Sequence, residues 1–159
     1  MANYVSEFQT SYPTGITDDI PVELIPQLKP YLATSDLLLL SHALTVLTVL
    51  LTYAPGASYP LVESSIVAPV YQLACSPLIA GQALEALASF FGALVEADNQ
   101  IASHVVPGLV IALEKSNAGE TSPANVSKCI SAIVKGAMSI AAGVIAEFAK
   151  AIRVRRAFL

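Results

Sequence analysis

Three prolines recur at the same place in three similar apolar segments, and this recurrence constrains the fold more than any other feature of the chain. Pro26 lies in ELIPQLKPYL, Pro69 in SIVAPVYQLA and Pro107 in SHVVPGLVIAL, at spacings of 43 and 38 residues. Proline removes a backbone donor and clashes with the preceding turn, so a helix normally ends or kinks there. Its return at an equivalent position indicates a helical unit that is repeated along the chain.

The length of this unit indicates the kind of repeat. Helix pairs with a period of about 40 to 47 residues are typical of HEAT and armadillo repeats. Hydrophobic residues make up 55% of the 159 residues and charged residues 13%, and the mean hydropathy is +0.65, so most helices should be buried on more than one side. The sequence therefore predicts an all-α protein, an α-α superhelix (a HEAT/armadillo-like solenoid) of about three and a half helix pairs.

The whole chain, 1–159, is predicted to be a single segment of this solenoid. Repeats are expected at approximately 17–54, 60–97 and 99–138, with partial helices at 3–12 and 139–156. Because each partial helix lacks a partner, we expect a fragment of a longer solenoid, whose neighbouring repeats would cover its ends.

Polar residues and breakers place the helix ends. In the first repeat, Thr17, Asp18 and Asp19 can cap and charge a helix start, Asp36 caps the second helix, and Ala54-Pro55-Gly56 ends it. In the second repeat we expect one helix from about Leu61 to Cys75, a turn at Ser76-Pro77 with Pro77 in the first turn of the next helix, and that helix running to about Ala97. The third repeat should pair a helix over 99–114 with one over 124–138.

Two helices carry a wetter stripe beside an apolar one. In the helix after Asp36 the wetter stripe is Ser41, Thr45, Thr48 and Thr52, and the apolar stripe is Leu40, Ala43, Leu44, Leu47 and Leu51. In the helix ending at Ala97 the wetter stripe is Gln82, Glu85, Ser89, Gly92 and Glu96, and the buried set is Ala83, Leu87, Phe90, Phe91, Leu94 and Val95.

A helical membrane protein is the alternative that hydropathy raises. Residues 37–62 contain no charged side chain and include LLLLSHALTVLTVLLTYA, which is long enough to span a bilayer. The hydroxyl stripe argues against this reading, because a lipid-facing helix needs none. Glu85, Lys128, Lys135 and Glu147 interrupt the other apolar stretches. We therefore expect no membrane partner.

The compartment is predicted to be intracellular, in the cytoplasm, the nucleus or both, because the N-terminus shows no secretory signal. Cys75 and Cys129 lack CxxC spacing and are interpreted as buried hydrophobic residues in a reducing compartment. The sequon Asn125-Val126-Ser127 is then a chance match. A net charge of -4 offers no basic face for nucleic acid.

The sequence predicts no catalytic, cofactor-binding or metal-binding residue. His42 and His104 stand in separate helices without other ligand types at metal-binding spacing, and both are interpreted as partly buried, hydrogen-bonded side chains. No nucleophile elbow or phosphate-binding glycine loop is present, so we expect a non-enzymatic protein. The basic tail of Lys150, Arg153, Arg155 and Arg156 is interpreted as a solvated helix end.

Two segments resemble a known family. SPLIAGQALEALASFFGALV (76–95), with its Ser-Pro-Leu turn, Gly81, Ala83-Leu84, Phe90-Phe91 and Ala93-Leu94-Val95, is similar to a HEAT repeat of the cullin-associated, neddylation-dissociated (Cand) proteins. VSKCISAIVKGA (126–137), with Lys128-Cys129, resembles the next helix of that family. The resemblance covers residues 3 to about 152 and places the chain in the middle of the family's solenoid.

The resemblance implies a non-enzymatic scaffold that wraps an unneddylated cullin with its RING subunit and assists assembly and exchange in cullin-RING (SCF) ubiquitin ligases. Its expected partners are that cullin complex and neighbouring repeats. The partner-binding residues stay unknown, because a chain of 159 residues is far shorter than the family's solenoid. Another HEAT or armadillo adaptor, such as a transport receptor or phosphatase scaffold, is the alternative.

Overall fold

The computed structural model describes residues 17–115, 122–136, 149–150 and 153. In this part of the chain every regular element is a helix, which confirms the prediction of an all-α protein. The α-helices are α2 (Asp19–Leu28), α3 (Leu37–Tyr53), α4 (Pro55–Ser65), α5 (Val67–Cys75), α6 (Gly81–Ala97), α7 (Ala102–Lys115) and α8 (Pro123–Gly136). Two short 3-10 helices, η1 (Lys29–Ala33) and η2 (Asn99–Ile101), lie beside α2 and α7.

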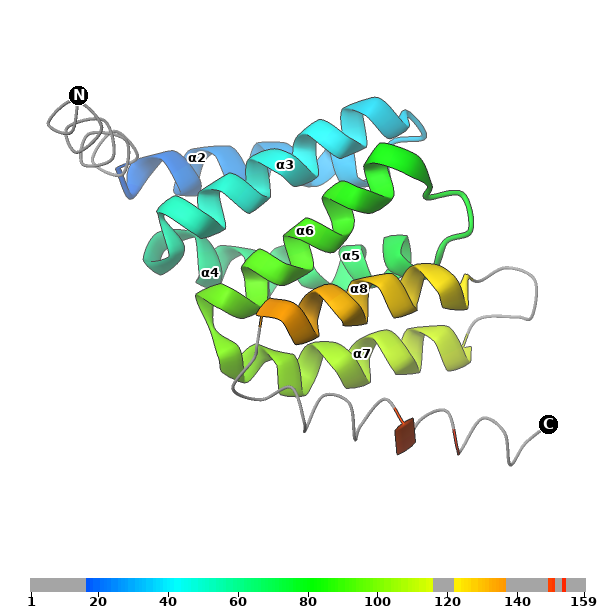
Figure 1. Cartoon of the computed structure of the whole chain (residues 1–159). Coiled ribbons are helices and arrows are strands. Elements are labelled where there is room, and N and C mark those ends of the chain that lie inside the picture. The colour runs from blue at the N-terminus through cyan, green and yellow to red at the C-terminus, as the bar shows by residue number, and fades with distance from the viewer. Residues whose placement is uncertain (1–16, 116–121, 137–148, 151–152, 154–159) are drawn as a thin grey trace, which may run out of the picture.

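The helices form two layers (Figure 1). The two longest of the described helices, α3 and α6, lie side by side with α8, and the contacts between α3 and α6 and between α6 and α8 are the most extensive among the described elements. The other layer contains α2, α4, α5 and α7, in which α2 contacts α4 and α5 contacts α7; in this view α4 and α5 lie behind α6, and α7 lies below α8. The chain therefore alternates between the layers, from α2 to α3, through α4 and α5 to α6, and through α7 to α8.

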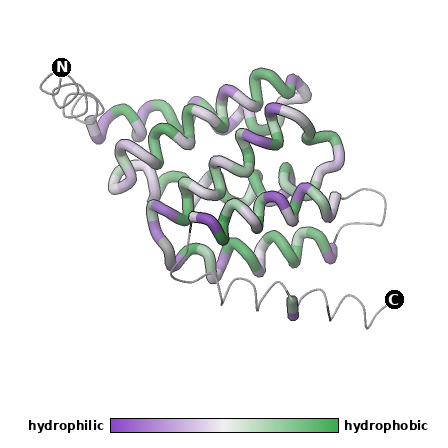
Figure 2. The backbone as a smooth tube through the Cα atoms, viewed as in Figure 1, coloured by the Kyte–Doolittle hydropathy of each residue, from purple (hydrophilic) through white to green (hydrophobic). Residues whose placement is uncertain are grey.

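The core lies between the two layers and contains the side chains that the sequence stripes predicted. Leu40, Ala43, Leu44, Leu47 and Leu51 of α3 are all buried, as is the complete predicted set of α6. Phe90 and Phe91 are fully buried, and their rings meet edge to face with centroids 5.8 Å apart. Hydrophobic residues accordingly predominate along the helices (Figure 2).

The three prolines do not occupy equivalent positions within their helices, so that part of the prediction is wrong. Pro26 lies two residues before the end of α2, Pro69 is the third residue of α5, and Pro107 lies inside α7. All three helices nevertheless belong to the same layer (Figure 1). The prolines therefore share a layer and differ in helical position.

The single helix expected from about Leu61 to Cys75 is wrong, because α4 and α5 replace it and the chain bends at Ile66. Pro69 has no N–H to donate to the Ser65 carbonyl, and its ring crowds that carbonyl, so the helix cannot continue unbroken. The first helix also begins earlier than predicted. Pro55 is the first residue of α4, where its missing donor costs nothing.

Pro77 was expected in the first turn of a helix, and this is also wrong. The segment 76–79 forms a turn in which the Ser76 side chain accepts from the Leu78 N–H at 3.3 Å and the Ser76 carbonyl from the Ile79 N–H at 3.4 Å. Helix α6 starts only at Gly81, whose φ of +58° favours glycine. The preceding turn therefore satisfies its own backbone before the helix begins.

Of the two helix caps predicted in the first repeat, the structure confirms the one at the start of α3 but shows no side-chain cap at the start of α2. The Asp36 carboxylate accepts from the N–H groups of Leu38 and Leu39, at 3.0 and 3.1 Å, and so caps α3 as expected. Asp18 holds the cap position of α2 without a side-chain hydrogen bond to the helix. Asp19 supplies the predicted negative charge in the first turn of α2.

The helices predicted over 99–114 and 124–138 correspond to η2 with α7 and to α8. Met138 and most of the predicted partial helices at 3–12 and 139–156 lie outside the described residues.

Candidate functional site

One face of the molecule is formed by α3, α6 and α8, and a groove runs over it. The groove has a volume of about 390 Å³. Its lining residues are small or polar: Thr48 and Thr52 from α3; Ala88, Ser89, Gly92, Ala93 and Glu96 from α6; and Ala132, Lys135 and Gly136 from α8. We refer to these residues as the groove.

The α3 wall of the groove is made of threonines whose hydroxyl protons are already used. The Thr48 hydroxyl donates to the Leu44 carbonyl and the Thr52 hydroxyl to the Thr48 carbonyl, each at 2.8 Å. A hydroxyl has one proton to donate and two lone pairs that accept. These oxygens therefore present only acceptor capacity to the groove.

The floor of the groove is low because α6 and α8 approach closely. A Cβ on Gly136 would lie 2.8 Å from the Gly92 carbonyl oxygen, and a Cβ on Gly92 would lie 3.7 Å from the Ala132 carbonyl oxygen. Absence of side-chain atoms at this crossing lets the backbones meet. Gly136 therefore packs closely against one specific residue of α6, Gly92.

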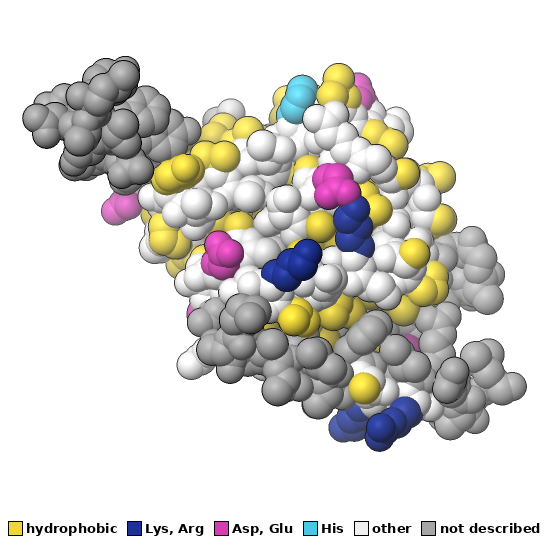
Figure 3. Space-filling model, viewed as in Figure 1, with side chains coloured by type: hydrophobic (Ala, Val, Ile, Leu, Met, Phe, Trp, Pro, Cys, Tyr) yellow, Lys and Arg dark blue, Asp and Glu magenta, His cyan; other side chains and the backbone are white. Residues whose placement is uncertain are grey.

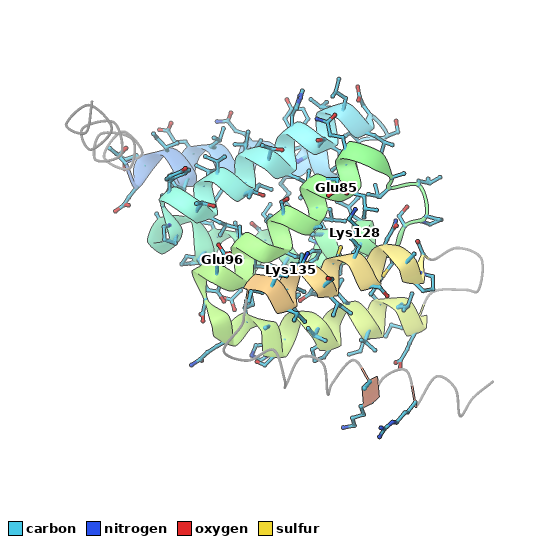
Figure 4. The ribbon with its side chains drawn as sticks, viewed as in Figure 1. Glu85, Glu96, Lys128 and Lys135 are labelled. Atoms are coloured by element: carbon cyan, nitrogen blue, oxygen red, sulfur yellow. The ribbon has the colours of Figure 1, made fainter. Side chains whose placement is uncertain are left out.

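Charged side chains on this face gather in two acid–base sets between α6 and α8 (Figures 3 and 4). Lys128 forms an ion pair with Glu85, and both side chains are exposed. Glu96 and Lys135 lie toward the other ends of the same helices and line the groove. Neither of these two groups makes an ion pair with any described residue.

The position of α8 relative to α6 is fixed by Asn125. Its side-chain amide donates to the carbonyls of Ser76, at 3.0 Å, and Ile79, at 2.8 Å, in the turn before α6. The Ser122 N–H adds a bond to the Cys75 carbonyl at 2.8 Å. The predicted chance sequon therefore contains a buried amide whose nitrogen is occupied by two backbone carbonyls.

The two cysteines lie in the core, as predicted, and are free thiols. Burial raises the pKa of the Cys129 thiol to about 12, with a further rise from the neighbouring Cys75 and a small opposing effect of Lys128. Burial also raises the pKa of the Cys75 thiol. Both groups are therefore held as neutral thiols, which is the opposite of an activated nucleophile.

The predicted surroundings of the histidines are wrong. His42 and His104 are both exposed, because each side chain falls on the outward face of its helix instead of the partly buried face expected. Among the described residues, no group of three His, Cys, Asp or Glu side chains is placed to hold a metal ion. Lys150 and Arg153 of the basic tail are exposed, while Arg155 and Arg156 lie outside the described residues.

The groove itself was missed by sequence reasoning, although its parts were visible. The hydroxyl stripe of α3 and the wetter stripe of α6 were both predicted from helical periodicity. The periodicity of one helix does not predict how that helix is rotated relative to another helix, so it could not place the two stripes on one face. The one sequence feature that could have indicated the groove is that α3 and α6 each carry a stripe of small and polar residues.

In the described part of the chain, every helix is either too short or too polar to cross a membrane. Comparisons of this chain with protein-family models, curated proteins and solved structures find no match.

Proposed function

We propose that this protein is a non-enzymatic protein-interaction scaffold with a HEAT/armadillo-like solenoid arrangement. The observation that carries the proposal is the alternation of the chain between two layers, which leaves α3, α6 and α8 as one continuous face. Stacked helix pairs of this kind give an extended surface for gripping another protein. The groove is a hollow on that face, and its lining includes one acidic side chain, Glu96, and one basic side chain, Lys135.

The resemblance to Cand proteins supports a cullin with its RING subunit as the partner. The two segments that carry the resemblance become neighbours in space, since Glu85 of α6 pairs with Lys128 of α8 and Asn125 holds the turn at 76–79. On this reading the chain resembles part of an assembly and exchange factor for cullin-RING ubiquitin ligases.

The buried position of the residues that carry the Cand resemblance favours a second candidate function, that of another HEAT or armadillo adaptor. Phe90, Phe91 and Cys129 are fully buried, so these parts of the resemblance report helix packing and not partner contact. Another HEAT or armadillo adaptor, such as a transport receptor or phosphatase scaffold, would need the same interior. The two candidates differ only in the partner that occupies the surface.

Binding to a purified cullin–RING complex tests the Cand interpretation. The chain should bind the unneddylated complex more tightly than the neddylated one, as measured by biolayer interferometry. Ser89→Arg fills the groove with a large cation and should weaken binding, whereas Ser131→Arg places the same side chain at an exposed position of α8 outside the groove.

Failure of the unneddylated complex to bind the correctly folded chain would contradict the cullin assignment. Equal binding by the Ser89→Arg and Ser131→Arg variants would contradict the use of the groove. Circular dichroism of both variants provides the check that the fold is intact.

A further inference from the structure

We propose that two copies of this chain associate through α3, which lies at the open edge of its layer. In that layer α6 has a neighbour on each side, α3 and α8, whereas α3 packs extensively only on α6 among the described elements (Figure 1). Its other substantial contacts, with α2, η1 and α4, are made toward the other layer. The side of α3 that turns away from α6 is therefore available to a second molecule.

An apolar stripe runs along this side of α3. Its residues follow one another at alternating steps of three and four, which keeps them on one side of a helix: Leu39, His42, Val46, Val49 and Tyr53. We refer to these five residues as the α3 flank. Leu39 and Tyr53 are 40% and 42% exposed, the two valines are half-buried, and His42 is exposed. Apolar side chains left in water along one helix indicate a contact surface.

The chemistry of α3 selects an uncharged partner. The segment 37–62 contains no Asp, Glu, Lys or Arg, so α3 carries no charged side chain on any side. The hydroxyls of Thr45, Thr48 and Thr52 donate to carbonyls of α3 itself, each at 2.8 Å. A charged side chain pressed against this helix would lose its hydration and meet no counter-charge. The α3 flank of a second copy meets the requirement, because it is apolar along the same length.

The spacing of the α3 flank is the same in both directions from Val46. Leu39 and Tyr53 each lie seven residues away from it. Two antiparallel copies of α3 therefore place Val46 against Val46 and Leu39 against Tyr53, which is the self-matching contact that a two-fold dimer requires. This arrangement also brings the positive N-terminal end of each helix near the negative C-terminal end of the other.

Head-to-tail stacking of α3 on α8 of the next copy fits the surface less well. The exposed residues of α8 are mostly polar, and they are Pro123, Ala124, Ser127, Lys128, Ser131 and Lys135. Such packing would bury hydroxyl or ammonium groups against apolar side chains, whereas the two-fold contact leaves them in water. Since each copy contributes little more than one helix, we expect a weak dimer that dissociates on dilution.

Sedimentation velocity of the full chain over a range of concentrations tests the dimer. The wild type should show a monomer–dimer equilibrium. Val46→Glu and Val46→Lys should each weaken association by at least about tenfold, because two like charges then meet at the centre of the contact. An equimolar mixture of these two variants should recover association, since opposite charges meet there instead. Ser131→Glu, at an exposed position of α8, is the control and should dimerise as the wild type does.

A chain that stays monomeric at every concentration, unchanged association in both Val46 variants, or no recovery in their mixture would each overturn the inference. Loss of association in Ser131→Glu alone would assign the contact to α8 and also contradict it. Circular dichroism checks that the variants fold, and Leu39→Glu, at a more exposed position, should weaken association in the same way. The dimer is independent of the groove, so Ser89→Arg should leave it intact whether or not the cullin complex binds.

Discussion

Gly136 at the end of α8 lies directly against the backbone of Gly92 in α6. A Cβ added to Gly136 would come within 2.8 Å of the Gly92 carbonyl oxygen and 3.4 Å of its Cα. The obstacle is backbone, which cannot rotate away as a flexible side chain does. The two helices can hold their present separation only because position 136 lacks a Cβ, whereas a Cβ on Gly92 would lie at an ordinary contact distance of 3.7 Å from the Ala132 carbonyl oxygen.

Gly136→Ala should therefore lower the free energy of unfolding by about 1 to 3 kcal/mol, because α8 must move away from α6. Urea unfolding followed by far-UV circular dichroism measures this change. Gly56→Ala in α4 is the matched control, since its Cβ would meet nothing within 4 Å, and it should be neutral or stabilising. Equal unfolding midpoints for the two variants would show that the α6–α8 contact is not tight.

Asn125→Ala should destabilise the protein by about 1 to 3 kcal/mol, since it leaves the carbonyls of Ser76 and Ile79 without their side-chain donor. Asn125→Asp keeps the shape but removes the donor and adds a negative charge at a buried position, so it should be at least as damaging. Ser127→Ala, at an exposed position of the same helix, is the control. Wild-type stability of Asn125→Asp in urea unfolding would contradict the donor role.

The Cys129 thiol should react slowly in the folded protein. With the pKa raised to about 12 from an ordinary value of 9.0, very little thiolate is present at pH 8. Alkylation by iodoacetamide should then be about a thousandfold slower than in the urea-unfolded chain. Mass spectrometry of peptides containing Cys129 gives the rate. Comparable rates in the folded and unfolded states would mean that the thiol is not buried.

The same raised pKa makes stability depend on alkaline pH. The folded state holds the Cys129 proton more tightly than the unfolded state, so this contribution is complete below about pH 9 and is lost as the pH rises toward about 12. Cys129→Ala should lose less unfolding free energy than the wild type between pH 9 and 11, although it starts from a lower value because it leaves a cavity. Parallel pH profiles of the two proteins would contradict this linkage.

The Glu85–Lys128 ion pair should contribute little to stability despite its position between α6 and α8. The two side chains are 67% and 41% exposed, so water and salt screen their attraction. We expect Glu85→Gln to change the free energy of unfolding by less than about 1 kcal/mol. Urea unfolding at low and high salt measures it, and a loss as large as that of Asn125→Ala would refute the surface character of the pair.

Helical periodicity predicted the buried faces of α3 and α6 correctly. In each helix the predicted apolar set is buried, because a regular helix keeps residues three and four apart on one side; Ser41, which was assigned to the wetter stripe of α3, is buried as well. Asp36 was likewise predictable as a cap, since its carboxylate bonds only to the next turn of its own chain. These features depend on neighbours within one helix.

Predictions from proline were less accurate because proline acts on one carbonyl, and its effect depends on where the helix starts. Pro55 and Pro69 both lie in the first turn of a helix, while Pro26 and Pro107 lie further inside their helices. Pro77 belongs to a turn closed by Ser76. The three recurring prolines lie in helices of one layer, but their recurrence did not predict where each helix begins or ends.

The sequence by itself determined that this chain is helical and which apolar faces of its long helices are buried; of the hydroxyl stripe of α3 it correctly placed Thr45, Thr48 and Thr52 outside the core, but not Ser41, which is buried. These follow from local backbone geometry and from the removal of apolar side chains from water. Only the tertiary structure decided that the stripes of α3 and α6 share one face with Gly136 and Lys135 of α8. The rotation and separation of helices are set by contacts such as Gly92 with Gly136 and Asn125 with the turn at 76–79, which join residues far apart in the chain.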